Sequence, residues 1–303
     1  MTALVPRVQA RLALPAHRLV RGMLEGGYAA VHTGRGIELA DLRPYVRGDD
    51  PKDLEPKASA RSGELLVKRY VADRRHTALL VVPTGRSMAA HRRPGPDGTG
   101  AGATAKRDLA ALVAGLVGWL AVRHGDAVSL AHGDAGGHHV LRPAGGAAHL
   151  ERCLQAAHAA TTHQAAATDL VGLLQHLART VRRRTILLVV CDDVDASPDL
   201  VVVLRRLVAQ HEVLVAGIGE LDPTDPALAG GTWDLDAGAP LPSWLREDRR
   251  LRSEHAAGTA VRTRALAEAA AAAGASYEWV GDEDDAVRAV LRLLERHRRG
   301  RRR

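Results

Sequence analysis

The sequence predicts an α/β fold in which a mostly parallel sheet carries helices on both faces, with a charged N-terminal segment packed on it. Two observations support this fold class. From residue 77 onward, short apolar runs that suit buried strands alternate with longer helical patterns, as parallel sheets require. A chain of 303 residues can also bury such a core without disulfide or metal support.

The predicted elements follow from these patterns in chain order. Residues 7–24 predict one or two short helices, interrupted at Pro15 and ended by Glu25-Gly26-Gly27. The first buried strand is predicted at Thr77–Val82, because charged residues precede it and a turn sequence follows it. The later predictions are helices at 105–123, 147–158, 169–181, 198–210, 259–273 and 284–298, strands at 127–132, 138–141, 185–191, 212–218 and 276–280, and loops at 95–102 and 221–252.

The order of these elements indicates where a ligand would bind. In an open parallel sheet, ligands bind outside the carboxyl ends of the strands. The loops after Val82, Val190 and Ile218 are therefore the candidate ligand-binding edge.

Composition limits the class of protein. The two cysteines, Cys153 and Cys191, show no metal-binding spacing, and Cys191 is expected to be a small core residue. With no secretory signal at the start, we expect a reducing cytoplasmic location. The apolar run 109–122 is shorter than the ~20 residues that a membrane span needs, so a soluble protein without an integral membrane segment is predicted.

The net charge of +7 is concentrated at the C-terminus. Residues 292–303 carry seven arginines against Glu295, so the rest of the chain is almost neutral. A broad nucleic-acid-binding face is therefore not expected. The residues 299–303 are predicted to form a solvated basic tail, with an arm for an acidic partner or nucleic acid as the alternative. The predicted division of the chain is 1–75, 76–298 and 299–303.

The stretch Gly34–Tyr70 combines glycines, alternating charges and interleaved apolar residues. It is too polar to bury a core of its own, so we expect a cross-linked loop in which arginines pair with carboxylates. Two alternatives stay open: a solvated linker, and a segment whose charges serve only as internal bracing.

The motifs in this stretch resemble a known bacterial family. They are G-x-G-x-E at 34–38, D-L-R-x-Y at 41–45, G-D-D at 48–50 and S-A-R at 59–61. Their order and spacing are similar to those of the domain-of-unknown-function 58 proteins, which couple such a signature to a von Willebrand factor A-like domain. Two aromatic positions of the family pattern differ here, where Leu39 and Leu54-Glu55-Pro56 stand.

The resemblance also implies a divalent cation site at the top of the sheet. Such domains bind the ion through D-x-S-x-S after the first strand, a Thr and a further Asp, because Mg²⁺ prefers oxygen ligands. Here Pro83 and Gly85 replace the first Asp and Ser. The positions that remain are Ser87, Thr168 and Asp192, and Arg86 is expected to pair with Asp192 or Asp193. We predict a degenerate site that binds metal weakly or not at all, the alternative being a Mg²⁺- or Mn²⁺-dependent binder.

The resemblance implies a non-enzymatic interaction scaffold working with a MoxR-type AAA+ ATPase in assembly or maturation of complexes. No catalytic motif or cofactor fingerprint supports an enzyme, and His138 and His139 should point to opposite faces of a strand. A hydrolase or nucleic-acid-binding protein that uses the basic tail is the third hypothesis. The predicted partner-binding residues are Gly34, Gly36, Glu38, Asp41, Arg43, Tyr45, Gly48, Asp49, Asp50 and Arg61.

Overall fold

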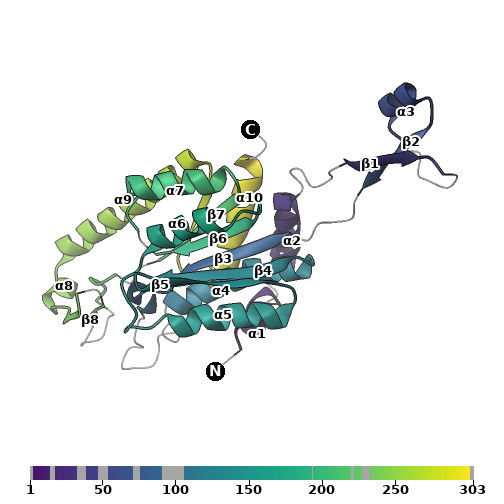
Figure 1. The fold of residues 1–303 in the computed structure, drawn as a ribbon. Helices are drawn as coiled ribbons and strands as arrows, with labels where there is room; N and C mark the ends of the chain where they lie inside the picture. The colour runs from purple at the N-terminus through teal and green to yellow at the C-terminus, as the bar shows by residue number, and fades with distance from the viewer. Residues whose placement is uncertain are drawn as a thin grey trace.

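The structure is a computed structural model that describes residues 3–13, 18–32, 39–46, 54–70, 76–90, 106–192, 194–219, 222–226, 233–235 and 237–300. Its centre is a six-stranded sheet in the order β10-β7-β6-β3-β4-β5 (Figure 1). The strands are β3 (Thr77–Pro83), β4 (Ala127–Asp134), β5 (Gly137–Ala144), β6 (Ile186–Cys191), β7 (Glu212–Ile218) and β10 (Ser276–Val280). All neighbours pair in parallel except the edge strand β5, which is antiparallel to β4.

This strand order confirms the predicted fold class. From β3 the chain builds outward to β4 and β5, then crosses to β6 and continues outward to β7 and β10. The sheet is therefore doubly wound, and its order reverses between β3 and β6. It is the mostly parallel, von Willebrand factor A-like arrangement that the resemblance implied, and it brings the ends of β3 and β6 side by side.

Helices cover both faces of the sheet, because the strands other than the edge strand β5 bury side chains on both sides. In β3, Leu80 and Val82 belong to one apolar core, and Leu79 and Val81 belong to the other. The first face is covered by α1 (Leu4–Ala13), α2 (Arg18–His32), α4 (Lys106–Arg123), α5 (Ala147–Ala160) and α10 (Ala286–Gly300). The second is covered by α6 (Leu170–Thr180), α7 (Pro198–Val208) and α9 (Arg249–Ala273).

The N-terminal helices differ from the prediction in length and in position. Helix α2 continues through Gly26 and Gly27, which were expected to end it. The reason is tertiary packing, since a Cβ on Gly27 would lie only 3.3 Å from the Cβ of Leu294 in α10. Val8 and Tyr28 are buried in the same core as β3, so α1 and α2 pack as part of the α/β unit and the expected division near residue 75 does not coincide with the packing.

The signature stretch forms two strands where a loop was expected. Strands β1 (Leu39–Pro44) and β2 (Leu66–Tyr70) pair antiparallel, with helix α3 (Pro56–Ser62) between them. We call residues 39–46 and 54–70 the signature hairpin. Figure 1 shows it standing away from the six-stranded sheet, which differs from the expectation that it packs there. The hairpin has a small apolar core of its own. Val67 is 1% exposed and forms an antiparallel β-bridge with Leu54.

The segment between β7 and β10, predicted as a loop up to residue 252, holds short pieces of structure and then a helix longer than predicted. The short pieces are β8 (Trp233–Asp234), β9 (Ala239–Pro240) and α8 (Trp244–Glu247). Helix α9 begins at Arg249 instead of 259, because the side chain of Asp248 accepts the backbone N–H groups of Arg250 and Leu251. It ends before Gly274 in the left-handed conformation, as predicted.

The other core elements lie within a few residues of their predicted positions. The predicted loop at 95–102 falls outside the described residues. No helix in the described part of the chain is long and apolar enough to cross a membrane.

Candidate functional site

A polar cluster lies where the sheet order reverses, at the carboxyl ends of β3 and β6. Ser87 belongs to a short 3₁₀ helix after β3, Thr168 directly precedes the cap of α6, and Asp192 follows β6. The Oγ of Ser87 lies 2.6 Å from Oγ1 of Thr168 and donates a hydrogen bond of 2.6 Å to Oδ2 of Asp192. The structure therefore brings together the three residues that the resemblance assigned to a cation site.

A lysine that the sequence analysis did not single out closes this cluster. The Nζ atom of Lys106 lies 3.5 Å from Oδ2 of Asp192, and both side chains are 6% exposed. Lys106 is the first residue of α4, where the helix dipole disfavours a cation. Burying either charge alone would be costly, so each requires the other. An ammonium group thus neutralises the carboxylate that occupies the cation-site position of the family motif.

The cation that pairs with Asp192 is not the predicted Arg86. The cation next to Asp192 is Lys106, whereas the backbone N–H of Arg86 donates to the carbonyl of Ala166 at 3.0 Å. The other predicted partner, Asp193, lies outside the described residues. Lys106 is far from both Ser87 and Asp192 in sequence; the available signal was a cation at the first position of an apolar helix.

The loop that carries Thr168 is held from two sides. On one side Ala166 accepts from Arg86, and on the other the carbonyl of Ala167 accepts the N–H of Ala135 at 2.9 Å. Asp134, at the end of β4, accepts the N–H groups of Gly136 and Ala166 through its two carboxylate oxygens. The β4–β5 turn therefore positions the Thr168 hydroxyl, which explains how a residue so distant in sequence reaches Ser87.

Gly85 shows why the metal motif cannot be complete. A Cβ at this position would lie 2.4 Å from both Cα and Oγ1 of Thr168, closer than real Cβ atoms come. The Thr168 backbone therefore fills the place where a serine side chain would stand. Pro83, at the end of β3, has no side-chain oxygen to offer. Among the described residues, no group of three or more His, Cys, Asp or Glu side chains could hold a metal ion.

Helix α6 is capped by Asp169, the residue directly after Thr168. The Oδ1 of Asp169 accepts the N–H of Gly172 at 2.8 Å, while its Oδ2 lies 4.0 Å from Nε2 of His138. Burial lowers the pKa of His138, an effect that the charge of Asp169 opposes. The Thr168 hydroxyl is therefore committed to Ser87.

Two sequence predictions about histidine and cysteine are confirmed. The ring of His138 lies 5.6 Å from that of His176, whereas the ring of His139 lies 5.4 Å from that of His132, so the adjacent histidines point to opposite faces. Cys191 is fully buried in the core, as expected of a small apolar residue.

Only part of the predicted signature set falls within the described residues. Asp41 and Arg43 lie in β1, opposite Arg69 and Val67. The backbone of Tyr45 donates to Leu65 at 2.8 Å, and Arg61 is exposed in the last turn of α3. The others, Gly34, Gly36, Glu38, Gly48, Asp49 and Asp50, lie outside the described residues.

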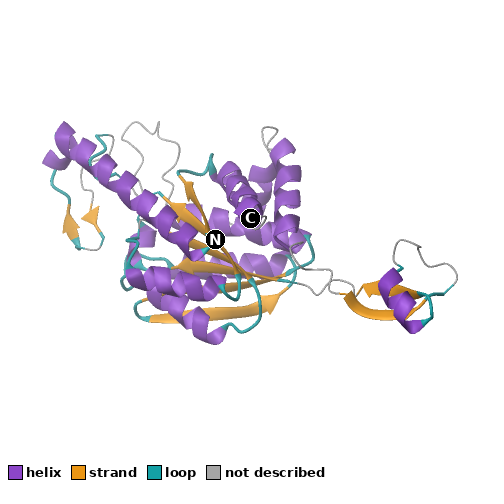
Figure 2. Ribbon diagram, turned by 90° about the horizontal axis from the view of Figure 1, so that it is seen from above, coloured by secondary structure: helices purple, strands orange, loops and turns teal. Residues whose placement is uncertain are grey.

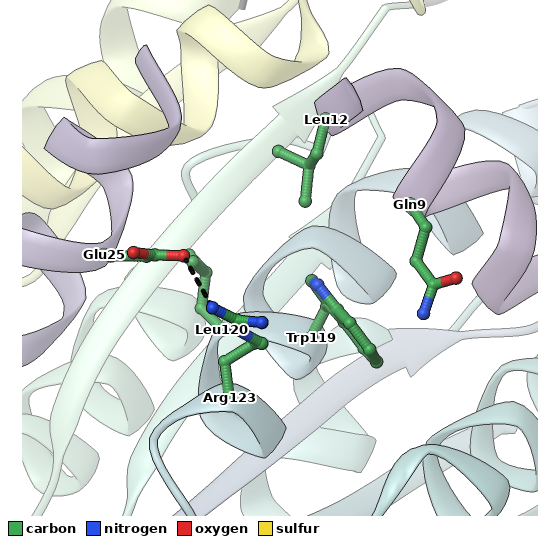
Figure 3. Close-up of a pocket in the computed structure, with 6 residues that line it drawn as sticks. All are labelled: Gln9, Leu12, Glu25, Trp119, Leu120 and Arg123. Atoms are coloured by element: carbon green, nitrogen blue, oxygen red, sulfur yellow. Dashed lines mark ion pairs between the residues drawn. The ribbon is translucent and has the colours of Figure 1, made fainter. Parts of the chain in front are cut away.

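A pocket of about 220 Å³ lies between α1, α2 and α4 (Figure 3). It is lined by Gln9, Leu12, Glu25, Trp119, Leu120 and Arg123. An ion pair of 3.6 Å joins Arg123 to Glu25. Because Trp119 lies 13 residues after Lys106 in α4, the pocket is roughly 20 Å along the helix from the polar cluster, and the two are separate features.

Two solved structures show a loose likeness to this chain. An aerotolerance-related membrane protein from Bacteroides fragilis, bearing multiple mutations to serines, has 13% identity and a TM-score of 0.44, with 73% of this chain and 98% of that chain covered. A von Willebrand factor type A structure from Catenulispora acidiphila has 10% identity and a TM-score of 0.39, with 74% and 43% covered.

The sequence relatives are more similar and extend over almost the whole chain. Uncharacterized proteins of Mycobacterium bovis and Mycobacterium tuberculosis are 27% identical over 296 residues, which covers 95% of this chain and 88% of theirs. A family model described as a protein of unknown function, DUF58, matches residues 41–265, about three quarters of the chain. The chain therefore belongs to the DUF58 family, as the signature motifs indicated.

Proposed function

We propose that this chain is a non-enzymatic, cytoplasmic protein-interaction scaffold that works with a MoxR-type AAA+ ATPase in the assembly or maturation of other complexes. The observation that carries the proposal is the closed cluster at the sheet's ligand-binding edge. Lys106 supplies a positive charge beside Asp192, which supports an edge that needs no divalent ion.

The Lys106–Asp192 pair supports a metal-independent version of an edge that related folds use with a cation. A bound Mg²⁺ needs near-octahedral oxygen ligands at close range. Here the Oδ2 atom of Asp192 already accepts from Ser87, and the carboxylate charge is compensated by an ammonium. The competing function is a Mg²⁺- or Mn²⁺-dependent binder that uses Ser87, Thr168 and Asp192.

Calorimetric titration with MgCl₂ and with MnCl₂ separates the two functions. We expect no saturable binding to the wild-type chain. Lys106→Ala removes the ammonium and should allow weak Mn²⁺ binding, and Lys106→Ala combined with Asp192→Ala should abolish that binding again. Micromolar binding to the wild type that Asp192→Ala eliminates would replace our proposal with the metal-dependent one.

The signature hairpin is the contact surface that we propose for the ATPase. It stands away from the sheet (Figure 1), and Val46 and Leu65 are 62% and 59% exposed. The backbone N–H of Tyr45 donates to the carbonyl of Leu65, so Val46 and Leu65 both lie just beyond the paired ends of β1 and β2. Exposed apolar side chains held on a paired backbone suit a protein interface better than a solvated linker does.

The partner is tested with the MoxR-type ATPase of the same genome, purified and nucleotide-free, by biolayer interferometry in EDTA. We expect binding that Val46→Ser combined with Leu65→Ser weakens about tenfold or more. Val140→Ser is the matched control, because Val140 is also exposed (44%) but lies on β5. Absence of wild-type binding would refute the ATPase as partner, and equal effects of both variants would refute the hairpin as its contact.

A further inference from the structure

A basic turn lies at the amino edge of the sheet, opposite the candidate functional site. Between α6 and β6 the chain carries three consecutive exposed arginines, Arg182, Arg183 and Arg184. The side-chain amide of Gln210 donates to the carbonyl of Arg182, and the hydroxyl of Thr185 donates to the carbonyl of Arg183 at 2.8 Å. The backbone of this turn is therefore fixed while its arginine side chains are exposed.

The end of α10 meets this turn through a shared carboxylate. Glu212, the first residue of β7, accepts a hydrogen bond from Arg184 and lies 3.1 Å from Nε2 of His297 in the last turn of α10. Arg298 and Arg299 directly follow His297 in the same helix, so Arg299 is helical where a solvated tail was predicted. Two groups of arginines that are far apart in sequence therefore share one surface.

The positive charge of this surface is largely uncompensated. We call its members the amino-edge arginines: Arg182, Arg183, Arg184, Arg298 and Arg299. The carboxylates that adjoin them, Glu212 and Glu295, are already paired, the second lying 3.8 Å from Arg299. Within the described part of the chain, Arg182, Arg183 and Arg298 form no ion pair. A surface with this excess of cations attracts a dense anionic partner.

The lack of apolar groups at this surface limits the kind of partner. Among the described residues, none of the large exposed apolar side chains lies in 181–185, 209–212 or 286–300. Protein partners are typically held by aromatic and apolar side chains at the centre of the interface. Single-stranded nucleic acid stacks its bases on aromatic side chains. The amino-edge arginines offer neither kind of contact, so their recognition is electrostatic.

The arrangement of the arginines favours a planar anionic surface over a nucleic-acid duplex. Neighbouring residues of a helix do not face each other, so Arg298 and Arg299 project in different directions and spread their charge over an area. A duplex presents its phosphates in lines beside grooves, which proteins follow with an inserted helix or strand. A bilayer with anionic lipids instead presents phosphates in a plane, and clusters of roughly 4–8 arginines or lysines bind it.

We propose that the amino-edge arginines dock this protein on the surface of a membrane rich in anionic phospholipid. The planar guanidinium group matches the oxygens of a phosphate headgroup. The contact is peripheral, since no apolar side chain of this surface enters the bilayer. In Figures 1 and 2 the end of α10 lies apart from the signature hairpin, so the hairpin stays open to a protein partner. The docking does not depend on the identity of the ATPase.

Co-sedimentation of the full chain with lipid vesicles tests this proposal. We expect binding to vesicles of phosphatidylcholine mixed with phosphatidylserine, no binding to phosphatidylcholine alone, and release by added NaCl. Two double variants, Arg182→Gln with Arg183→Gln and Arg298→Gln with Arg299→Gln, should each weaken binding about tenfold or more. Effects of similar size are expected, because both pairs belong to one surface.

Arg249→Gln combined with Arg250→Gln is the matched control. It removes the same charge from two exposed arginines at the start of α9. That helix ends just before β10 begins at the amino edge, so its start lies roughly 35 Å away along the helix. We expect the control variant to bind the vesicles as the wild type does.

Several results would overturn the proposal. One is a wild-type chain that does not sediment with the anionic vesicles or is not released by NaCl, a measurement that does not depend on how the variants fold. Another is a control variant as weak as the two double variants. If only Arg298→Gln with Arg299→Gln weakened binding, the C-terminal segment would act alone and the joint surface would be refuted. Binding to a labelled DNA duplex without binding to vesicles would replace the membrane with nucleic acid.

Discussion

Two buried polar clusters at opposite edges of the same sheet use similar groups. At the carboxyl edge, Asp192 accepts from Ser87 and faces Lys106. At the amino edge, Glu212 accepts from Arg184 and lies 3.1 Å from Nε2 of His297, whose Nδ1 is 3.0 Å from the Oγ of Ser276. Each cluster contains a hydroxyl, a carboxylate and a basic side chain.

The difference between the clusters lies in which elements they join. Glu212 and Ser276 begin the neighbouring strands β7 and β10, and His297 lies in the last turn of α10, so this cluster braces elements that already touch. Ser276 and His297 are 9% and 5% exposed, which leaves no open access to the hydroxyl despite the resemblance to a hydrolytic triad. The carboxyl-edge cluster instead joins loops that meet only because the sheet order reverses there. Strand topology therefore distinguishes a brace from a candidate binding edge.

The largest effect is expected from Lys106→Met. Asp192 would remain buried without its cation, which should lower the free energy of unfolding by about 3–5 kcal/mol at neutral pH. Asp192→Asn added to Lys106→Met removes the uncompensated charge and should recover much of that loss. Urea unfolding followed by circular dichroism measures both. A Lys106→Met chain as stable as the wild type would show that the two charges are not held together in a dry site.

Gly85→Ala should be the next most harmful change. The added methyl group would meet the Thr168 backbone at 2.4 Å, and relieving that contact should cost about 1–3 kcal/mol. Gly22→Ala in α2 is the matched control, because a Cβ there meets nothing within 4 Å, and it should stabilise the helix slightly. The same urea titration compares the two, and equal midpoints would contradict the close approach of the loops.

A smaller effect is expected at the amino edge from His297→Ala. Glu212 keeps Arg184 as a partner, so the loss should be about 1–2 kcal/mol, below that of Lys106→Met. Ser276→Ala, which removes only the hydroxyl, should cost less still. A loss of stability from His297→Ala as large as that from Lys106→Met would show that Arg184 does not compensate Glu212 for the loss of His297.

Tyr28→Phe should have the smallest effect near neutral pH. The hydroxyl of Tyr28 donates to Oδ2 of buried Asp126 at 3.1 Å, and losing that bond should cost about 1 kcal/mol. Burial raises the pKa of Tyr28, with a further contribution from the charge of Asp126. The unfolded chain therefore releases this proton first, so stability should fall as the pH rises above about 10. Tyr28→Phe should flatten that alkaline loss in urea midpoints measured against pH, and an unchanged slope would contradict it.

Individual residues show which parts of the fold and of the candidate site could be predicted from the sequence. The bounds of β7 were predicted to the residue, since an apolar run between a charge and a glycine leaves little choice. Ser87, Thr168 and Asp192 were identified through the family motif and do meet. Lys106 was not identified, because its contact with Asp192 links residues far apart in the chain.

Local periodicity and the signature motifs, both readable along the chain, determined the fold class and the family. Tertiary structure alone decided which cation faces Asp192, why position 85 must be glycine, and why α2 continues through Gly27. In each of these cases the deciding atom belongs to a distant segment, namely Lys106, Thr168 or Leu294. Hydrophobic patterns report which side of an element is buried, but they carry no information about which polar or backbone atom lies opposite once the layers close.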